Sequence, residues 1–552
     1  MTPSDHAYYW GIDSISLNGK TLFIGGWFFS SYHHCSEVWL ELISENKKLI
    51  ESIALNAGNP RPDVAMVHPH EQHALHSGFT GLGAWSSAPS STTELRLRCV
   101  LTDGSQHRLA IPEDRWRANH FKRSRRAKLK IRLAHFRHYG LKAAALVARG
   151  QLGVLRTKVV RQLSDQPTSQ IPNADQLAKL VQPEEHIAVH LIVDHRLGGG
   201  ANQYRERMIQ QYLLQGDTVL ILGFQITTLS LVLTVRRSDS TKHFYVNSDQ
   251  ELMNALPKIQ LSDIVYNTAV SFANPQGIPE LLSNLKRYNG GTLTLLLHDY
   301  FMICPSHFLL DKSGAYCGIP KPEVCQQCLP VNPHGFTSLF NGDILQWRKA
   351  WHSVIRNADK IIAFSKASAS LLEQTFPDSI QPGVLQIKPH EVAYLQGQVI
   401  SLNGAAPLVI GIVGQIGLHK GAEVVRDLAA EIRHQGGSER IAVIGTLEIN
   451  ADRTIISETG PYVHENLAEE IRRSGANLML LPSIWPETFS YVAQEMIELG
   501  LPLACFNWGA PAERIQAYPK GYLLSSRHPK EILEELRKFF RLLYSSASQP
   551  PL

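Results

Sequence analysis

The chain has 552 residues, and its 54 Lys and Arg against 49 Asp and Glu give a formal net charge of +5. That length exceeds one ordinary domain, so about three domains of ~150 residues each are expected. With 44% hydrophobic and 19% charged residues, the composition excludes wholesale disorder and a collagen-like chain. Seven cysteines are too few for a disulfide framework in a chain of this size.

Neither a targeting segment nor a membrane span is predicted. The first residues, MTPSDHAYYWGID, lack the basic and apolar regions of a secretory signal. The most apolar stretch, 218–235, is interrupted by Gly223, Gln225 and Ser230, and it only reaches the ~18 residues that a span needs. Two short buried strands are expected there instead. We therefore expect a soluble protein of a reducing compartment, the cytoplasm.

Residues 1–112 have the pattern of an all-β, sandwich-like module. Apolar alternation over 14–24 is interrupted by Asn18-Gly19, which is a hairpin signal. A second alternation, at 95, 97, 99 and 101, indicates a half-buried antiparallel strand. Residues 113–182 are expected to form a helical connector that ends in a polar linker.

The connector is strongly basic. The segment 115–161 carries 15 Lys and Arg and no Asp or Glu. Apolar residues such as Phe121, Ile131 and Leu141 lie between the charges, as in a helix that lies on an anionic membrane surface. A solvated basic linker that binds nothing is the alternative. Nucleic acid is not an expected partner, because no recognised nucleic-acid motif accompanies the charge.

From residue 183 the pattern changes to strand, Gly-rich turn and helix, and it starts again near residue 401. Strands are predicted at 187–193, 218–222, 263–266, 292–297 and 360–364, and then at 408–413, 441–444, 477–481 and 502–505. Such alternation forms parallel sheets covered by helices. The predicted fold class is α/β, with two doubly wound, Rossmann-like domains at 183–400 and 401–552. The first contains a Cys-rich loop at 300–335.

Ligands of open parallel sheets bind outside the carboxyl ends of the strands. The residues that follow the predicted strands are expected to line one crevice; they are Gly198, Gly199, Gly200, His298, Asp299, Gly414, Gln415, Lys420, Gly445, Thr446 and residues 482–487. A dinucleotide is disfavoured, because Gln203 stands where its fingerprint has a third glycine. Gly-rich turns that open helices still bind phosphate, and Lys420 would neutralise a diphosphate. An ordinary surface lysine is the alternative.

Two glutamates are the sharper signal. Glu487 follows a predicted strand, and Glu495 falls on the apolar face of a helix predicted at about 490–499. A carboxylate on a buried face is costly unless it accepts hydrogen bonds. Sugar or ribose hydroxyls would supply these bonds. A buried ion pair with an internal arginine such as Arg514 is the alternative.

Several segments resemble those of a known family. The stretch 414–421, GQIGLHKG, resembles the donor-phosphate turn of retaining glycosyltransferases of family four, which have the two-domain GT-B fold. The stretch 482–495, PSIWPETFSYVAQE, is similar to their E-x7-E element, and the resemblance covers about 186–515. The front module, with RPDV at 61–64 and SGF at 77–79, resembles β-rich modules of bacterial surface-polysaccharide glycosyltransferases.

The resemblance implies a role for each site residue. Glu495 would hold the ribose hydroxyls, Glu487 the hydroxyls of the donor sugar, and Lys420 the leaving diphosphate. His298 would contact the donor sugar near the reacting carbon. The remaining residues implied in donor binding are Gly199, Gly200, Gly414, Gln415, Thr488 and Phe489.

The implied activity is sugar transfer from a nucleotide diphosphate sugar to a glycan or lipid-linked glycan acceptor. The family retains anomeric configuration and needs no metal or other cofactor. Its expected setting is surface polysaccharide or lipopolysaccharide synthesis, with the protein cytoplasmic or peripheral on the inner face of the cytoplasmic membrane.

Gln415 departs from the family, which commonly has Arg after the glycine of the donor turn, and a fork-shaped cation is thereby lost. Compensation by another arginine, low donor affinity and a degenerate site are all open. The main alternative is a non-catalytic glycan-binding or assembly protein. A third is an epimerase of the nucleotide sugar itself.

Four of the seven cysteines lie together, at Cys304, Cys317, Cys325 and Cys328, with spacings x12, x7 and x2. Four thiolates could hold a structural zinc ion that pins a loop with little core of its own. Buried free thiols are the alternative, since only one pair has the tight C-x2-C spacing.

Overall fold

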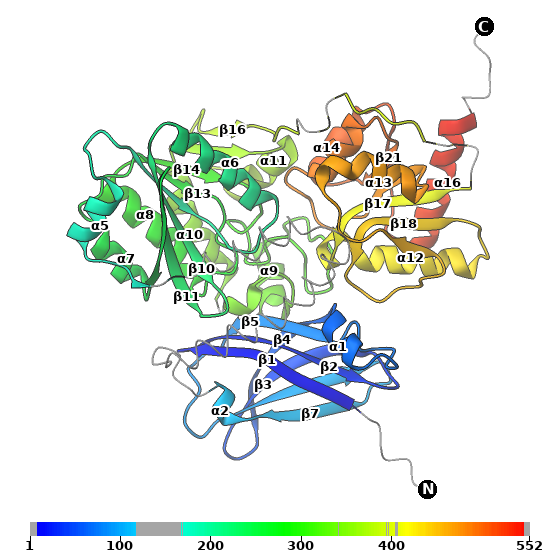
Figure 1. Cartoon of the computed structure of the whole chain (residues 1–552), viewed down its shortest axis with the longest axis horizontal. Helices are drawn as coiled ribbons and strands as arrows, with labels where there is room; N and C mark the ends of the chain where they lie inside the picture. The colour runs from blue at the N-terminus through cyan, green and yellow to red at the C-terminus, as the bar shows by residue number, and fades with distance from the viewer. Residues whose placement is uncertain are drawn as a thin grey trace. The chain divides into compact units, whose positions relative to one another are not determined.

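The computed structural model describes residues 8–116, 167, 169–340, 342–392, 395, 397–402, 404 and 407–545 (Figure 1). The chain divides into two compact units. Unit 1 spans Met1–Thr294 and Phe336–Asp359, and unit 2 spans Leu295–Gly335 and Lys360–Leu552. Apart from Arg115 and Trp116, the predicted membrane-binding segment 115–161 lies outside the described residues. Of the helices described, none combines the length and the apolar character needed to cross a membrane.

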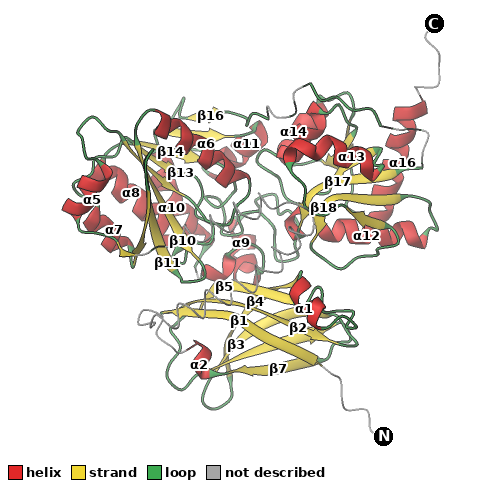
Figure 2. Ribbon diagram, viewed as in Figure 1, coloured by secondary structure: helices red, strands yellow, loops and turns green. Residues whose placement is uncertain are grey.

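The front of unit 1 is an antiparallel sheet with strand order β1-β2-β5-β4-β3-β6-β7. Its elements are β1 (Tyr8–Asn18), β2 (Thr21–Ser30), β3 (Cys35–Ile43), β4 (Leu49–Asn59), α1 (Pro62–Val67), β5 (Gly78–Ala84), β6 (Glu94–Leu101), β7 (Gln106–Ile111) and α2 (Glu113–Trp116) (Figure 2). The ring centroids of Tyr8 in β1 and His107 in β7 are 4.6 Å apart, so the sheet curls and brings its two edge strands together around one core. The predicted all-β module is confirmed in part, as one curled sheet with two short helices.

The RPDV and SGF segments of this module fix the loop between β4 and β5. Arg61 is 6% exposed, and its guanidinium binds the carboxylates of Asp63 and Asp13. Val64 packs against Phe29 in a small second core. A Cβ on Gly78 would lie 2.9 Å from Cγ of Arg61, so glycine lets the arginine cross the strand.

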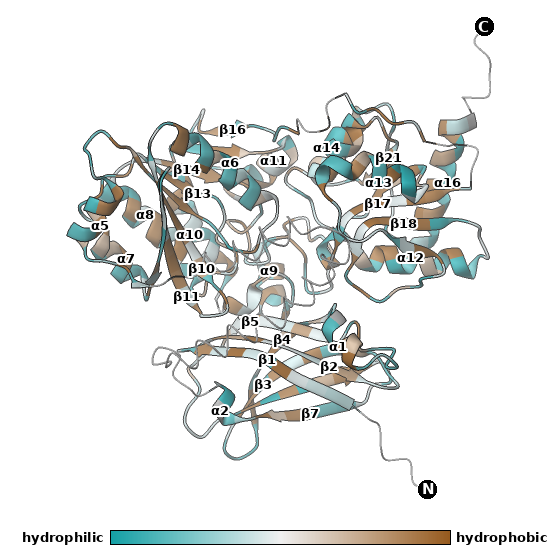
Figure 3. Cartoon of the chain, in the orientation of Figure 1, coloured by the Kyte–Doolittle hydropathy of each residue, from teal (hydrophilic) through white to brown (hydrophobic). Residues whose placement is uncertain are grey.

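The second sheet of unit 1 contains the strand order β13-β9-β10-β11-β12-β8. Its strands are β8 (Ser169–Gln170), β9 (Val189–Val193), β10 (Thr218–Gln225), β11 (Ser230–Arg236), β12 (Thr241–Val246) and β13 (Asp263–Tyr266). The helices of this part are α5 (Ala174–Val181), α6 (Gly200–Leu214), α7 (Asp249–Ala255), α8 (Ile278–Asn289) and α10 (Ile344–Arg356). The strands are mostly hydrophobic (Figure 3), as expected of strands covered on both faces.

Strands β9, β10 and β13 are parallel, as predicted. The stretch 218–235 forms two strands, also as predicted. However, β11 pairs antiparallel with both β10 and β12, so the prediction of a purely parallel sheet is wrong here. A short turn between β10 and β11 leaves no room for a crossover helix, and antiparallel pairing is then the only choice.

Unit 2 is built on a fully parallel sheet with strand order β19-β18-β17-β20-β21-β22. The strands are β17 (Val409–Ile416), β18 (Arg440–Leu447), β19 (Ile456–Glu458), β20 (Leu478–Leu481), β21 (Leu503–Phe506) and β22 (Gly521–Leu524). One core cluster includes residues of α12 (Ala422–His434) and α16 (Pro529–Ser545). A second includes residues of α13 (Leu467–Ser474), α14 (Tyr491–Glu498) and α15 (Gly509–Gln516). The sheet is therefore doubly wound, as predicted.

Unit 2 also takes in the end of β14 (Thr292–Leu296), the Cys-rich loop with α9 (Pro322–Cys328), β15 (Lys360–Ala363), α11 (Lys366–Thr375) and β16 (Leu385–Ile387). Backbone N–H of Lys366 and Ala367 donate to the carboxylate of Glu513 in α15. That carboxylate thus lies at the start of α11, where the helix dipole favours negative charge.

Candidate active site

The predicted donor turn follows β17, which ends beside β18. Gly414 has φ +118 and Gly445 has φ +138, a backbone region that favours glycine. A Cβ on Gly445 would overlap the carbonyl oxygen of Gly414. The two strand ends thus come into direct contact, and no larger residue fits at position 445.

The same turn packs against the loop that carries Glu487. Gly421 has φ +84, and a Cβ there would overlap the carbonyl oxygen of Pro482. The N–H of Ile484 donates to the carbonyl of His419 at 3.1 Å. Lys420 is half-buried, and within the described part of the chain no carboxylate forms an ion pair with its ammonium group. The structure therefore brings the loops of Lys420 and Glu487 together, as the crevice prediction requires.

Glu487 carries a buried carboxylate at the site. Its side chain is buried, at 7% exposure, and its Oε1 atom has no hydrogen-bond partner among the described residues. Leaving a buried polar atom unsatisfied costs about 1–3 kcal/mol, and more for a charged one. Burial raises the pKa of the nearby Tyr300 hydroxyl, and the Glu487 charge raises it further. The site therefore holds an acceptor that a ligand hydroxyl would satisfy.

A strained turn connects Glu487 to α14. Ser490 has φ +67 although it is not glycine, and its hydroxyl accepts a hydrogen bond from the N–H of Ala493 at 3.3 Å. Strained backbone of this kind persists only where the surroundings impose it, and it clusters at functional sites. Thr488 and Phe489, which precede it, are buried, and the Thr488 hydroxyl donates to the carbonyl of His298 at 3.0 Å.

Glu495 lies in α14 and is 1% exposed, so the predicted burial of this carboxylate is observed. Its Oε1 atom lies 3.3 Å from Nδ1 of His464. The hydrogen bond to Glu495 raises the pKa of His464. His464 is half exposed and is a site residue that the sequence reasoning missed. It lies 31 positions upstream, in a segment without a recognisable motif.

Arg514 does not take the role of an internal partner for Glu495. Its guanidinium donates to the side chain of Gln494 and lies 3.8 Å from the ring centroid of Phe489. Burial lowers its pKa to about 10. A cation over an aromatic face is stabilised by the ring quadrupole, so Arg514 supports the Glu487–Glu495 segment through Phe489.

Gln415 is exposed at the end of β17, and its amide donates to the carboxylate of Glu448. The position where the family commonly has an arginine thus carries a neutral amide bonded to an acid. The turn itself carries one lysine, Lys420.

His298 follows β14 and lies in a stack of rings. Its ring is 4.5 Å from Phe364 and 5.6 Å from His390. His390 in turn contacts Phe489 at 4.6 Å and Tyr491 at 5.1 Å between centroids. The stack joins the His298 loop to the segment after Glu487, and His390 is a second residue missed at the sequence level.

A second aromatic group joins the start of the Cys-rich loop to the donor loops. The Tyr300 hydroxyl donates to the carbonyl of Pro486 at 2.6 Å. Phe308 stacks on His419 at 4.3 Å and 4°, and it contacts Trp485 at 4.8 Å. Burial, and then the charge of Lys420, lowers the pKa of His419 to about 3. His419 is therefore a neutral packing residue.

Gly199 and Gly200 lie in unit 1, where Gly200 opens α6 and Gly199 has φ +86. The N–H of Gly198 donates to Oδ1 of Asn202 at 2.6 Å, and Asn202 and Arg205 both donate to the buried Asp194. This network holds the Gly-rich turn. That the turn shares a crevice with the donor residues stays a prediction.

The four clustered cysteines are free thiols, and burial raises the pKa of Cys317 to about 11. Within the described residues, no three His, Cys, Asp or Glu side chains converge in a way that could hold a metal ion. The side chains present do not fit a zinc site, so structural zinc stays a prediction without support from the geometry.

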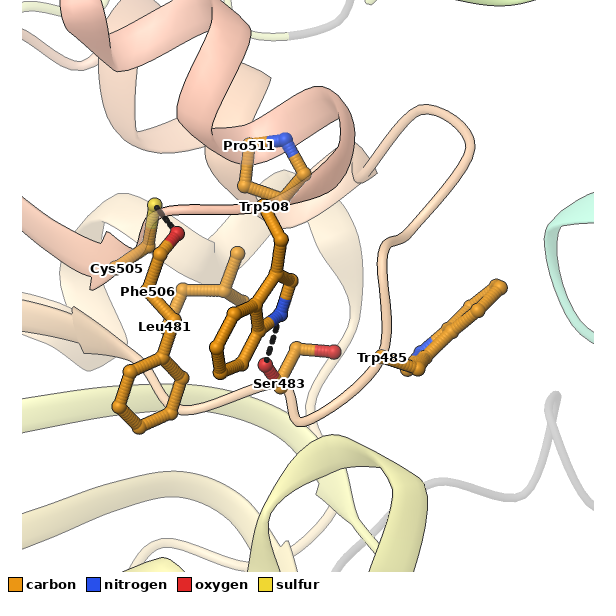
Figure 4. A pocket seen from close by; sticks show the side chains of 7 residues that line it. All are labelled: Leu481, Ser483, Trp485, Cys505, Phe506, Trp508 and Pro511. Atoms are coloured by element: carbon orange, nitrogen blue, oxygen red, sulfur yellow. Dashed lines mark hydrogen bonds between the residues drawn. The ribbon is translucent and has the colours of Figure 1, made fainter. Parts of the chain in front are cut away.

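A small hollow lies behind the Glu487 loop, at the ends of β20 and β21 (Figure 4). The indole of Trp508 crosses it and donates to the carbonyl of Ser483 at 3.1 Å. The lining is mostly apolar and carries no charged side chain; it consists of Leu481, Ser483, Trp485, Cys505, Phe506, Trp508 and Pro511. These lining residues support the Glu487 loop, and none of them could bind a charged ligand through a charge of its own.

Comparison with known protein families finds a match for the C-terminal part of unit 2. Residues 401–543 match the family described as Glycosyl transferases group 1. The chain as a whole matches no curated protein.

Similar solved structures are distant. HepE of Anabaena, in complex with UDP and glucose, is 14% identical with a TM-score of 0.40, and the alignment covers 66% of this chain and 92% of HepE. A glycosyltransferase of Rickettsia africae is 11% identical with a TM-score of 0.42, covering 65% and 89%. The pneumococcal O-GlcNAc transferase GtfA is 14% identical with a TM-score of 0.36, covering 59% and 60%.

Proposed function

We propose that the protein is a glycosyltransferase that moves a sugar from a nucleotide diphosphate sugar to a glycan or lipid-linked glycan acceptor. The observation that carries the proposal is the pairing of two loops in the segment that matches the group 1 family. One loop offers the ammonium of Lys420, and the other offers the buried carboxylate of Glu487; among the described residues neither the ammonium nor Oε1 of Glu487 has a partner. A sugar phosphate carries both a phosphate and free hydroxyls, so one such ligand would satisfy both groups.

In this proposal Glu495 and His464 face the ribose, where the carboxylate accepts hydrogen bonds from the ribose hydroxyls. Lys420 and the N–H groups that open α12 stabilise the diphosphate. Glu487 accepts from a hydroxyl of the donor sugar, and His298 lies near the anomeric carbon. Gly414 and Gln415 border the phosphates, Thr488 and Phe489 support the sugar pocket, and Gly199 and Gly200 face the phosphates and acceptor from unit 1.

The reaction replaces one bond by another at the anomeric carbon. The bond from this carbon to the diphosphate oxygen breaks, and a bond to the acceptor oxygen forms with retention of configuration. The acceptor hydroxyl passes its proton to the leaving oxygen of the diphosphate, which departs with its remaining negative charge. The contributions of the chain are positioning and stabilisation of that departing charge, and no cofactor is assigned.

The setting that we propose is synthesis of a surface polysaccharide or lipopolysaccharide by a cytoplasmic protein. The basic segment 115–161 would hold it on the anionic inner face of the cytoplasmic membrane, next to a lipid-linked acceptor. Co-sedimentation with anionic vesicles that falls steeply with salt would support this setting. Binding that salt does not weaken, or no binding, would contradict it.

A panel of nucleotide sugars tests the activity. A donor present at 100 times its dissociation constant should stabilise the protein by about 2.7 kcal/mol, seen as a shift of the thermal midpoint. Nucleotide release with lipid-linked acceptors then measures transfer. Lys420→Ala should slow release, whereas Lys349→Ala, an exposed lysine of unit 1, should not. Equal rates in both variants would contradict the role of Lys420.

The second candidate is a non-catalytic glycan-binding or assembly protein. The bond between Gln415 and Glu448 favours it, because the donor turn then lacks a second cation beside the phosphates. In that case no nucleotide sugar would shift the thermal midpoint, and no acceptor would cause nucleotide release. Nucleotide release that needs both an acceptor and Glu495 would rule it out.

A further inference from the structure

The front module carries an aromatic face on the side opposite its core. In β2, Phe28 belongs to the main core of the module, whereas its neighbours Trp27 and Phe29 point to the other face and contact α1 and the loop after it. Strand β1 extends this outer face, because Tyr9 pairs with Phe29 and Gly11 pairs with Trp27. The patch defined by Tyr9, Trp27, Phe29 and His68 is called the outer aromatic face below.

Phe29 is nearly parallel to each of the two rings beside it. Tyr9 and Phe29 are 5.1 Å apart at 24°, and Trp27 and Phe29 are 6.0 Å apart at 24°. The indole of Trp27 packs against Gly11, since a Cβ there would lie 2.9 to 3.1 Å from three of its ring atoms. Trp27 therefore contacts the backbone of β1 closely, and its side chain is only half-buried.

A fixed carboxylate borders these rings. Asp13 lies at the irregularity of β1, where the register shifts between Ile12 and Ser14, and a bulge of this kind re-aims a side chain. Its Oδ2 atom accepts from Nη1 of Arg61 at 2.6 Å, yet the side chain is 44% exposed. Arg61 is held from the other side by Asp63. The carboxylate is thus oriented and still open to solvent.

The small second core of the front module explains only part of the outer aromatic face. It accounts for Phe29, which is 1% exposed, and for Val64 and Ala74 above it. Trp27 also packs against this core and is only half-buried, but the core does not account for Tyr9, which is 37% exposed. An aromatic ring with an accessible face beside a fixed hydrogen-bond acceptor is a ligand-binding arrangement.

We propose that the outer aromatic face of the front module binds a saccharide, with Tyr9 and Trp27 stacking on sugar rings and the carboxylate of Asp13 accepting a hydrogen bond from a sugar hydroxyl. A pyranose offers an apolar C–H face and a rim of hydroxyls, which match flat rings beside a carboxylate. Asp13 and Asp63 place two negative charges around the single positive charge of Arg61, so this edge of the outer aromatic face is net negative. A neutral sugar is therefore favoured over a uronic acid or a phosphate ester. The site does not depend on the transfer reaction proposed above.

The test uses the full chain in native gels that contain one polysaccharide each: a glucan, a mannan, a galactan or a polyuronate. At least one neutral polysaccharide should retard the protein, and the polyuronate should not. Tyr9→Ala and Trp27→Ala should each raise the dissociation constant obtained from the retardation by roughly tenfold or more, as expected of aromatic anchors. Tyr32→Ala is the control, since Tyr32 is 62% exposed and lies outside the outer aromatic face.

Gly11→Ala is a second variant, because the added methyl group would lift the indole while both aromatic residues remain. Thermal midpoints confirm that each variant is folded. If no neutral polysaccharide retards the wild type, or if Tyr9→Ala and Gly11→Ala are retarded like it, the proposal is wrong. The midpoint shift caused by a nucleotide sugar should be the same in Tyr9→Ala and wild type, so a failure of the saccharide site is distinguishable from a failure of the proposed transferase activity.

Discussion

At the scale of single residues, the candidate site is defined by acids and bases whose surroundings differ. Glu487 and Glu495 are both buried, but Glu495 pairs with His464 whereas Oε1 of Glu487 has no partner in the described part of the chain. The two carboxylates therefore suit different tasks. Glu495 is held in place before a ligand arrives, and Glu487 gains its hydrogen bonds only when one binds.

Glu495→Gln tests the first of these tasks. The amide keeps the shape of the side chain but loses the charge, so hydrogen bonds to ribose hydroxyls weaken. We expect the dissociation constant for the donor to rise roughly tenfold, which is about 1.4 kcal/mol. Isothermal titration with the nucleotide sugar that stabilises the wild type measures it. Glu498→Gln, in the same helix, is the control, and equal losses in both variants would contradict a specific role for Glu495.

His464 predicts a pH dependence of stability. Because its pKa is raised in the folded state above the usual 6.5, its contribution to stability is complete below that value and is lost as the pH rises through the folded pKa. The wild type should therefore lose stability relative to His464→Gln as the pH rises above the usual 6.5 and through the folded pKa. The measurement is the difference in thermal midpoint across this range. A constant difference would contradict the pairing, and the exposed His434→Gln serves as the control.

At the scale of elements, close backbone contacts assemble the site. The donor turn meets the Glu487 loop at Gly421 and Pro482, and β17 meets β18 at Gly414 and Gly445. These contacts explain why glycines stand there, beyond any direct role in phosphate binding. They also show why Lys420 and Glu487 need no contact between their own side chains in order to be placed together.

Gly421→Ala separates steric overlap from backbone strain. The methyl group would overlap the carbonyl of Pro482, and φ is +84, so we expect a loss of stability on the order of 3 kcal/mol and a loss of donor binding. Gly436→Ala is the matched control, because φ is +64 but nothing lies within 4 Å of the new atom; it should cost about 1 kcal/mol. Equal losses in denaturant unfolding would show that strain alone matters and that the turn does not pack on the loop.

At the scale of the whole molecule, the sequence predicts what is periodic or local. The front hairpin at Asn18-Gly19, the two strands within 218–235 and the parallel strands of unit 2 follow from alternation and turn chemistry. The burial of Glu495 follows from helical spacing. The curl of the front sheet does not follow, since it depends on long-range contacts. The antiparallel pairing of β11 with β10 is local and follows from the short turn between them, although the predicted sheet is purely parallel.

The sequence also does not predict contacts between side chains that lie far apart along the chain. His464 with Glu495, and His390 with Phe489, are joined only by the fold. No spacing rule connects them, because a loop of any length can bring a side chain to the end of a strand. The same holds for the Cys-rich loop, which follows β14, the neighbour of β13 in the second sheet, yet belongs to unit 2.

That loop provides the last prediction. Tyr300 is fully buried, and its hydroxyl donates to the carbonyl of Pro486, directly before Glu487. Tyr300→Phe removes the hydroxyl that donates this hydrogen bond and leaves the carbonyl of Pro486 without it. The expected loss of folding stability is about 1–3 kcal/mol. We expect a lower thermal midpoint, weaker stabilisation by the donor sugar, and faster cleavage of the 300–335 loop by a protease. Tyr316→Phe is the control, since this residue lies in the same loop and its hydroxyl forms no hydrogen bond to another described residue. If Tyr300→Phe weakens donor stabilisation and Tyr316→Phe does not, the loop shapes the donor site through Pro486. If both variants bind donor like the wild type, the loop only packs against unit 2 and has no part in the placement of Glu487.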